Sequence, residues 1–123
     1  MKVVTFEIKD AATAMAQFQE AFEAAHGRKP FKPKSGVYFT SLAAVRNFLT
    51  PKRLALLRLI RAKKPHSIYH LAQLTGRSFS SVLKDVDMLA KHGLVRLSRD
   101  KASARRAVHP CVGYSAIQVW INV

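Results

Sequence analysis

The sequence predicts a mixed α+β protein in which a series of short helices is followed by a β-hairpin. Residues 67–86 read as two short amphipathic helices separated by a turn that contains Gly76. The alternating segment 94–98 then leads into a basic, short-chained stretch suited to a hairpin tip. The chain also opens with alternating, branched and aromatic residues at 3–8, which predict a strand.

The charge of the chain is strongly positive and unevenly placed. Of 123 residues, 21 are Lys or Arg and 7 are Asp or Glu, which leaves a formal net charge of +14. Residues 1–50 hold 7 basic and 4 acidic side chains, whereas residues 51–123 hold 14 and 3. Such a field attracts polyanions, so the second half is expected to bind nucleic acid with strong salt dependence. A generally basic protein without a nucleic-acid partner is the alternative.

Cysteine content and hydropathy favour a soluble, cytoplasmic protein. The lone Cys111 excludes a disulfide framework and fits a reducing compartment. The first ten residues lack the apolar core and cleavage site of a signal peptide, and no apolar run is long enough to cross a bilayer. We therefore expect no membrane partner.

The N-terminal part reads as a strand and a helix followed by a linker. Asp10 is placed to cap a helix that reaches His26, with Met15, Phe18 and Phe22 at helical spacing. The prolines and like charges of residues 28–36 indicate a linker. The sequence thus predicts an N-terminal arm over 1–27, a linker over 28–36 and a main domain over 37–123.

Within the main domain, hydroxyl residues mark the starts of the helices. A short strand is expected at 37–39, and four residues are then placed as N-caps: Ser41, Thr50, Ser67 and Ser78. Pro51 directly after Thr50 is a preferred first helical residue. In the last helix, the spacing of Phe79, Val82, Leu83, Val86 and Leu89 predicts a buried stripe.

Strands complete the chain. Residues 94–98 and 107–109 are expected to form the two arms of a hairpin with a basic tip between them, Pro110 is expected to interrupt the second arm, and 115–123 reads as a final strand. Three helices followed by a basic hairpin make a winged helix-turn-helix. The predicted fold class is therefore α+β, a winged helix-turn-helix with an N-terminal strand-helix appendage.

Several segments resemble a known family. Residues 49–57, 67–72, 76–78, 82–95 and 114–119 are similar to those of the small MarR-like winged helix-turn-helix transcriptional regulators of prokaryotes. The resemblance implies sequence-specific DNA binding as a homodimer, commonly as a repressor of the protein's own operon. Some members of that family lie beside toxin genes and act as antitoxins. The wing of these relatives is often short and acidic to neutral, whereas the corresponding segment here is basic.

The helix over 79–92 is the expected reader of the DNA major groove. Its start offers hydroxyls and charges within reach of bases and phosphates, and the expected base or near-base contacts are Arg77, Ser80, Ser81 and Lys84. Arg77 is the side chain suited to bidentate pairing with guanine. Ser78 could cap the helix and also touch a phosphate. Plain capping and solvent exposure is the alternative for the serines.

Basic residues elsewhere are expected to hold the DNA backbone. Four of them lie on the predicted wing: Arg99, Lys101, Arg105 and Arg106. Lys52 and Arg53, at a helix start, are further candidates for phosphate contact. A solvated loop and an exposed basic helix face are the respective alternatives.

Catalytic, metal-binding and cofactor-binding motifs are not evident, so we expect no enzyme. His66 and His70 are four residues apart, but no acidic residue lies nearby in sequence, and His109 and Cys111 lack a zinc-site spacing. Asp85 is expected to serve as an ion-pair partner for Lys84, Lys91 or a neighbouring helix.

Dimerisation is expected because a single small module reads too few base pairs. The candidate interface residues are Val4, Phe6, Phe18, Phe22 and Trp120. The strand at 3–8 must pair either with 115–123 or with a strand of a second chain. Trp120 is expected either to pack under the helix of Phe18 and Phe22 or across the dimer, or else to be buried within its own subunit.

The sequence thus leads to a DNA-binding transcriptional regulator, with double-stranded DNA and a second copy as partners. Two alternatives remain open. An antitoxin would bind a cognate toxin as well as operator DNA, through residues 1–36. A basic binder of RNA or chromatin would lack sequence preference.

Overall fold

The computed structural model describes residues 2–26, 37–99 and 108–123. These residues form a mixed α+β structure with five helices, a parallel three-stranded sheet and a two-stranded antiparallel hairpin. The chain divides into two compact units: Met1–Phe48 with Ser115–Val123, here called the sheet unit, and Leu49–Tyr114, here called the helical unit.

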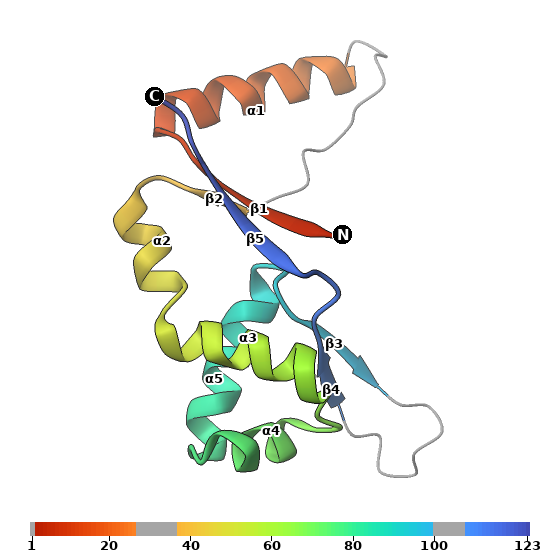
Figure 1. Cartoon of the computed structure of the whole chain (residues 1–123). Coiled ribbons are helices and arrows are strands. Elements are labelled where there is room, and N and C mark those ends of the chain that lie inside the picture. Colours follow the sequence, from red (N-terminus) through yellow and green to blue (C-terminus); the bar gives the residue numbers. More distant parts are fainter. Residues whose placement is uncertain (1, 27–36, 100–107) are drawn as a thin grey trace. The chain divides into compact units, whose positions relative to one another are not determined.

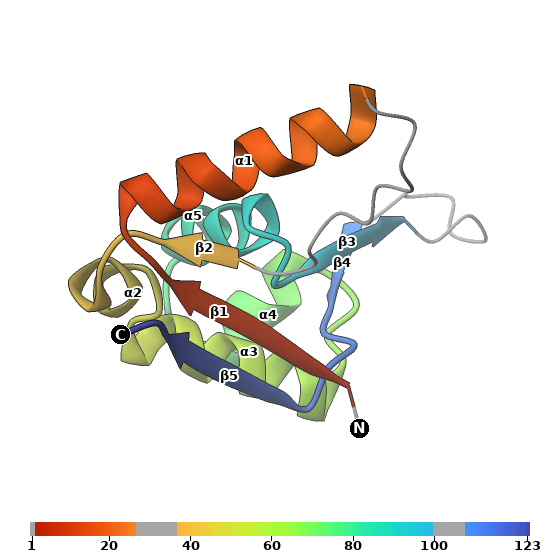
Figure 2. The ribbon, with the colours of Figure 1, turned by 90° about the horizontal axis from the view of Figure 1, so that it is seen from above.

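The sheet unit is built around its first strand (Figure 2). Strand β1 (Val3–Ile8) lies between β2 (Val37–Phe39) and β5 (Ala116–Ile121) and pairs with both in parallel. Of the two partners expected for the first strand, the C-terminal one is therefore present in the same chain. Ser115 extends the pairing, since its backbone N–H donates to the carbonyl of Lys2 at 2.9 Å.

Three aromatic rings fill the core of the sheet unit. Phe6 is fully buried, and its ring centroid lies 5.3 Å from Phe39 and 6.1 Å from Phe48. Phe48 ends α2 (Leu42–Phe48), which the Ser41 hydroxyl caps by accepting from the N–H of Ala44 at 3.1 Å. This burial corrects one prediction, because Phe6 lies inside the core and is not available to a dimer interface.

Other apolar residues of the sheet unit remain exposed. Helix α1 (Ala11–His26), capped by Asp10, carries Phe18 at 66% and Phe22 at 57% exposure. On β5, Trp120 is 56% exposed, so its predicted burial within the subunit is wrong for the described residues. Val119 and Ile121 of the same strand are exposed as well. Parallel sheets are normally covered on both faces, so this strand is unusual in meeting solvent on both.

Three helices form the helical unit (Figure 1). They are α3 (Pro51–Lys63), α4 (Ile68–Thr75) and α5 (Phe79–Lys91), and the side-chain oxygens of Thr50, Ser67 and Ser78 accept from backbone N–H groups of their first turns as predicted. Gly76 ends α4 at φ 70°, a left-handed conformation that glycine adopts without strain. Local signals in the sequence therefore set the helix boundaries.

A two-stranded hairpin follows the helices. Strand β3 (Arg96–Arg99) pairs antiparallel with β4 (Val108–Cys111). Pro110 was expected to interrupt the second strand, but it lies within β4 opposite Leu97 and is fully buried. A strand paired on one side only can hold a proline, because the missing N–H can face away from the ladder.

The boundaries of the sheet unit and the helical unit differ from the division expected from the sequence. Strand β2, helix α2 and strand β5 fall within the predicted 37–123 domain, yet they cluster with β1 and α1 in the sheet unit. The predicted linker over 28–36 lies outside the described residues. Within the described part of the chain, no helix has the length and apolar character needed to cross a membrane.

Candidate nucleic-acid interface

Helix α5 has one buried and one exposed side, but the buried stripe is narrower than its spacing predicts, because Phe79 is 45% exposed and Leu83 is only half-buried. Val82, Val86 and Leu89 are fully buried in the helical unit. Ser80, Ser81 and Lys84 are exposed. The polar side of α5 is therefore accessible to solvent in the helical unit.

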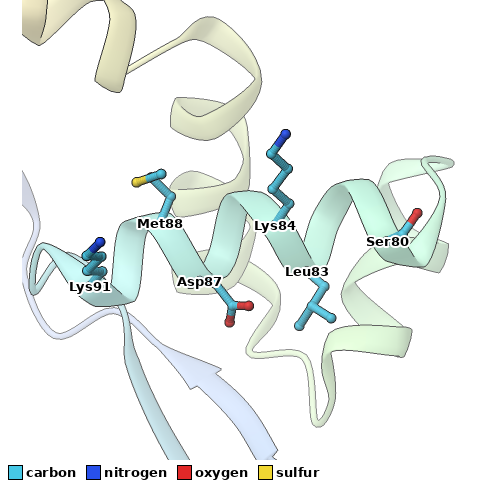
Figure 3. A pocket seen from close by; sticks show the side chains of 6 residues that line it. All are labelled: Ser80, Leu83, Lys84, Asp87, Met88 and Lys91. Atoms are coloured by element: carbon cyan, nitrogen blue, oxygen red, sulfur yellow. The ribbon is translucent and has the colours of Figure 1, made fainter.

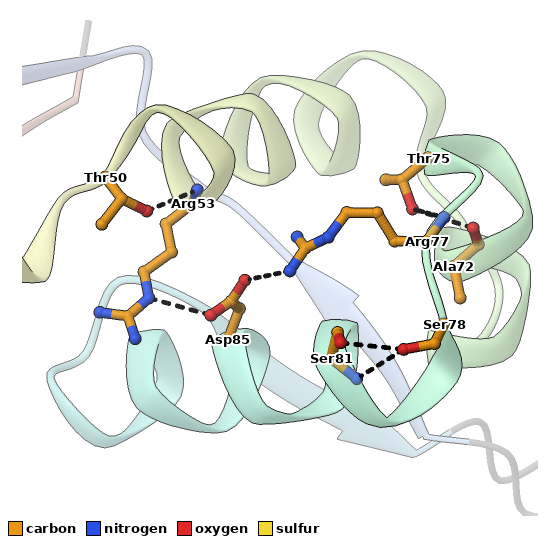
Figure 4. A network of polar contacts seen from close by, with 8 residues as sticks. All are labelled: Thr50, Arg53, Ala72, Thr75, Arg77, Ser78, Ser81 and Asp85. Carbon is orange, nitrogen blue, oxygen red and sulfur yellow. Dashed lines mark hydrogen bonds and ion pairs between the residues drawn. The ribbon is translucent and has the colours of Figure 1, made fainter.

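The start of α5 is organised by two serines. The Ser78 hydroxyl accepts from the N–H of Ser81 at 3.3 Å and donates to the Ser81 hydroxyl at 2.9 Å (Figure 4). Capping, the alternative weighed for the serines, therefore applies to Ser78. Ser81 remains exposed, and Ser80 makes no hydrogen bond to another described residue.

An ion network lies behind this start and joins α3 to α5. Nη2 of Arg77 donates to Oδ2 of Asp85 at 2.7 Å, and Nε of Arg53 donates to Oδ1 of the same carboxylate at 3.1 Å (Figure 4). The three side chains are 14–24% exposed. The neighbouring-helix partner expected for Asp85 is therefore present, in Arg53, whereas no ion pair joins Asp85 to Lys84 or Lys91.

The network holds Asp85 ionised. Burial raises the pKa of this carboxyl, but the hydrogen bonds and charges of Arg77 and Arg53 outweigh burial, and the pKa lies below its ordinary value. Arg77 is fixed from its backbone too, because its N–H donates to Oγ1 of Thr75 at 3.2 Å. Its Nη1 atom is buried and has no hydrogen-bond partner among the described residues.

These contacts change how two predicted site residues are understood. Arg77 was expected to contact bases, but its guanidinium points to Asp85 and could reach a base only by breaking that ion pair. Arg53 was expected to meet phosphate, and it is likewise engaged by Asp85. Lys52, its neighbour, is exposed, and its contact with phosphate stays a prediction. Ion pairs between elements depend on the tertiary fold, which explains why the local sequence did not reveal them.

A shallow depression of about 400 Å³ runs along the exposed side of α5 (Figure 3). It is lined by Ser80, Leu83, Lys84, Asp87, Met88 and Lys91. Figure 3 shows the Lys84 and Asp87 side chains extending in different directions from the exposed side of α5. Of these six residues only Ser80 and Lys84 were predicted as site residues, although the period of α5 places the other exposed ones on the same side.

Other basic side chains of the helical unit lie outside α5. A groove of about 500 Å³ is lined by residues of α3, by Thr75 and by Arg77, and it includes Lys52 and Arg58. On the hairpin, Arg96 and Arg99 are exposed at the two ends of β3. The other predicted wing residues, Lys101, Arg105 and Arg106, lie outside the described residues.

Histidines form one further polar contact in the helical unit. The rings of His66 and His70 stack with centroids 4.1 Å apart, and the backbone N–H of His66 donates to Nδ1 of His70 at 3.3 Å. Among residues 2–26, 37–99 and 108–123, no group of three or more His, Cys, Asp and Glu side chains could hold a metal ion.

A comparison with known protein families assigns this chain to one of them. It belongs to the HVO_A0114 family, whose model matches residues 48–119 and so covers the helical unit and most of β5. That family carries no MarR name, so the resemblance to MarR-like regulators stays a prediction. The search of curated proteins found no match for the chain.

Proposed function

We propose that this protein is a sequence-specific DNA-binding transcriptional regulator that binds as a homodimer and represses its own operon. The observation that carries the proposal is the exposed polar side of α5, anchored from behind by Val82, Val86 and Leu89. In this interpretation the helical unit is a winged helix-turn-helix of MarR-like type, with α4 and α5 as the two helices of the motif and β3–β4 as the wing.

Charge supports DNA as the partner of the helical unit. Residues 49–114 include 14 basic and 3 acidic side chains, and so account for +11 of the net charge of +14. Of the three acidic residues, Asp85 is already neutralised by two arginines. The remaining exposed cations, among them Lys52, Lys84 and Arg99, suit contacts to phosphates on either side of a groove.

The start of α5 adds a further phosphate contact. Its first N–H groups carry the positive end of the helix dipole, and no acidic residue in the first turn opposes an approaching anion. Since Arg77 and Arg53 are held by Asp85, we propose that they fix the angle between α3 and α5 rather than contact DNA.

The sheet unit supports dimerisation. Phe18, Phe22 and Trp120 are all more than half exposed, and an apolar patch that combined them would be typical of a protein interface. Strand β5 also has an unpaired edge within the described residues. Two β5 edges that pair around a twofold axis would cover this edge in both subunits.

The DNA proposal is tested by competition binding. Fluorescence anisotropy with the duplex upstream of the protein's own gene, in the presence of scrambled duplex, should give a specificity ratio of about 10³ or more at moderate salt. Equal affinity for both duplexes would instead identify a basic binder without sequence preference.

A matched pair of variants tests the assigned surface. Lys84→Gln should weaken binding to the upstream duplex, because it removes a cation from the exposed side of α5. Arg46→Gln makes the same charge change on the exposed surface of α2 in the sheet unit and should leave binding nearly unchanged. Equal losses in the two variants would show that only net charge matters.

Dimerisation is tested separately. Sedimentation should give a dimer for the wild type and a monomer for Phe18→Glu, because a charge cannot be buried in an apolar interface. A wild-type monomer that co-purifies with the product of a neighbouring gene would favour the antitoxin alternative, since the exposed apolar side of α1 would then suit a toxin.

A further inference from the structure

From the exposed side of α5 we infer that Asp87 reads the base sequence by accepting a hydrogen bond from the exocyclic amine of a cytosine. This inference rests on the proposed DNA-binding function and assigns a specificity-determining residue within it. Asp87 lines the depression along α5 together with Lys84, Met88 and Lys91, so it lies on the side that would face the major groove.

An acidic side chain is costly at this position unless it has a partner. It would approach phosphates of the same sign, and the structure shows no hydrogen bond or ion pair from Asp87 to another described residue. Nor does Asp87 lie in the first turn of α5, where the helix dipole would stabilise an anion. Asp87 is therefore solvated in the free protein and takes no part in the polar contacts that hold the fold, so its side chain is available to a partner.

Charge balance with the neighbouring lysines does not account for it either. Lys84 and Lys91 are three and four residues away along α5, a spacing at which helical ion pairs form. Figure 3 nevertheless shows the Asp87 and Lys84 side chains extending in different directions from the exposed side of α5. No ion pair joins Asp87 to either lysine among the described residues. The Asp85 carboxylate two residues away illustrates the contrast, because it is held by two guanidinium groups.

The chemistry of the major groove then identifies the base. A carboxylate only accepts hydrogen bonds, and cytosine presents a donor amine there without an acceptor of its own beside it. Guanine presents two acceptors and thymine an acceptor and a methyl group, so both repel or exclude a carboxylate. Adenine has a donor next to an acceptor and fits less well. Cytosine is thus the preferred partner, and Arg77, engaged by Asp85, is not the main reader.

The test is selection of binding sites from a random duplex library by wild type and by Asp87→Asn, with no assumed operator. The wild type should enrich sites that have cytosine at one position of each half-site, with a preference of roughly tenfold over other bases. Asp87→Asn should reduce the cytosine preference at that position or redirect it to adenine, which an amide can bind bidentately. Other positions of the site should be unchanged, and so should the midpoint of thermal unfolding.

A charge control completes the experiment. Glu20→Gln, an exposed residue of α1, raises the net charge by the same amount and should select the wild-type motif. If Asp87→Asn keeps the wild-type motif and binds all duplexes more tightly by the same factor, Asp87 only tunes the electrostatic field, and the inference is overturned. If the wild type itself enriches no motif, the proposed regulator function fails and the inference falls with it.

Discussion

The two units of this protein differ in which chemical groups they leave on the surface. The helical unit pairs its partly buried charges and exposes cations and hydroxyls along α5, although Tyr69 and Phe79 are exposed as well. The sheet unit buries the Phe6, Phe39 and Phe48 cluster but leaves large side chains of α1 and β5 in solvent. The proposed function gives the two units different partners, a polyanion for the helical unit and an apolar protein surface for the sheet unit.

The largest effect is expected from two phenylalanines of the sheet unit with opposite surroundings. Phe6→Ala should lower the free energy of unfolding by about 3–5 kcal/mol, because it leaves a cavity among buried rings. Phe18→Ala removes a side chain that is 66% exposed and, in dilute monomer, should cost far less. Urea denaturation measures both. Similar losses would mean that α1 packs within the subunit and that the proposed contrast is wrong.

The ion network of the helical unit provides the next test. Asp85→Ala should lower the free energy of unfolding by about 3 kcal/mol, because it leaves two partly buried guanidinium groups without their counterion. Asp87→Ala, two residues away on the exposed side, should change it by less than about 0.5 kcal/mol. The midpoint of urea unfolding at constant slope compares them, and equal effects would contradict the structural role of the network.

The same network makes stability depend on acid. The pKa of Asp85 is lowered in the folded protein, so its contribution is present above the pKa of the unfolded chain, about 3.9, and is lost as the pH falls through the folded value. Stability should therefore decline more steeply below about pH 4 in the wild type than in Asp85→Ala. Parallel acid profiles for the two proteins would argue against the ion pairs.

Tyr114 makes the helical unit sensitive to alkali as well. Its hydroxyl donates to the carbonyl of Leu94 at 2.9 Å, and burial raises its pKa to about 12. The stabilisation is complete below the unfolded pKa, about 10, and is lost as the pH rises toward the folded value. Tyr114→Phe should cost about 1 kcal/mol at neutral pH and should lose less stability between pH 10 and 12. Urea denaturation of both proteins at several pH values over that range measures the two losses of stability.

The smallest effect separates capping from recognition at the start of α5. Ser78→Ala should destabilise the protein by about 1 kcal/mol, because it removes the acceptor for the Ser81 N–H. Ser80→Ala removes an exposed hydroxyl and should leave stability unchanged while weakening binding to DNA. Thermal unfolding and anisotropy on the same samples distinguish the two serines. A loss of stability in Ser80→Ala would show that its hydroxyl has a structural role.

Much of the local structure could be predicted because its causes are local. Asp10, Ser41, Thr50, Ser67 and Ser78 each cap the helix that the sequence assigned to them. Spacing also predicted the burial of Val82, Val86 and Leu89 in α5, but it wrongly included Phe79, which is 45% exposed, and Leu83, which is half-buried. Pro110 was misjudged, because a proline rules out a central strand but not one strand of a two-stranded ribbon.

The remaining features depend on contacts between distant parts of the chain. The partner of Arg77 lies eight residues further along the chain and that of Arg53 lies 32 residues away, so neither followed from composition or helical period. Phe6 and Phe18 look alike in sequence, yet one is buried and the other exposed. The exposed side of α5 could be predicted from its period, but the engagement of Arg77 and Arg53 by Asp85 could not.

The position of β1 beside β5 has a consequence for how the chain folds. The Ser115 hydroxyl donates to the Lys2 carbonyl across a separation of 113 residues, and the segment that forms the helical unit comes between β1 and β5 in the sequence. Contacts between residues so far apart in the sequence are slow to form, whereas the helix–helix contacts of residues 49–114 join residues that are closer in the sequence. During synthesis on the ribosome, β1 therefore pairs with β5 only after the helices have formed. In a pulse-labelled hydrogen-exchange experiment, the backbone amides of β1 should become protected late.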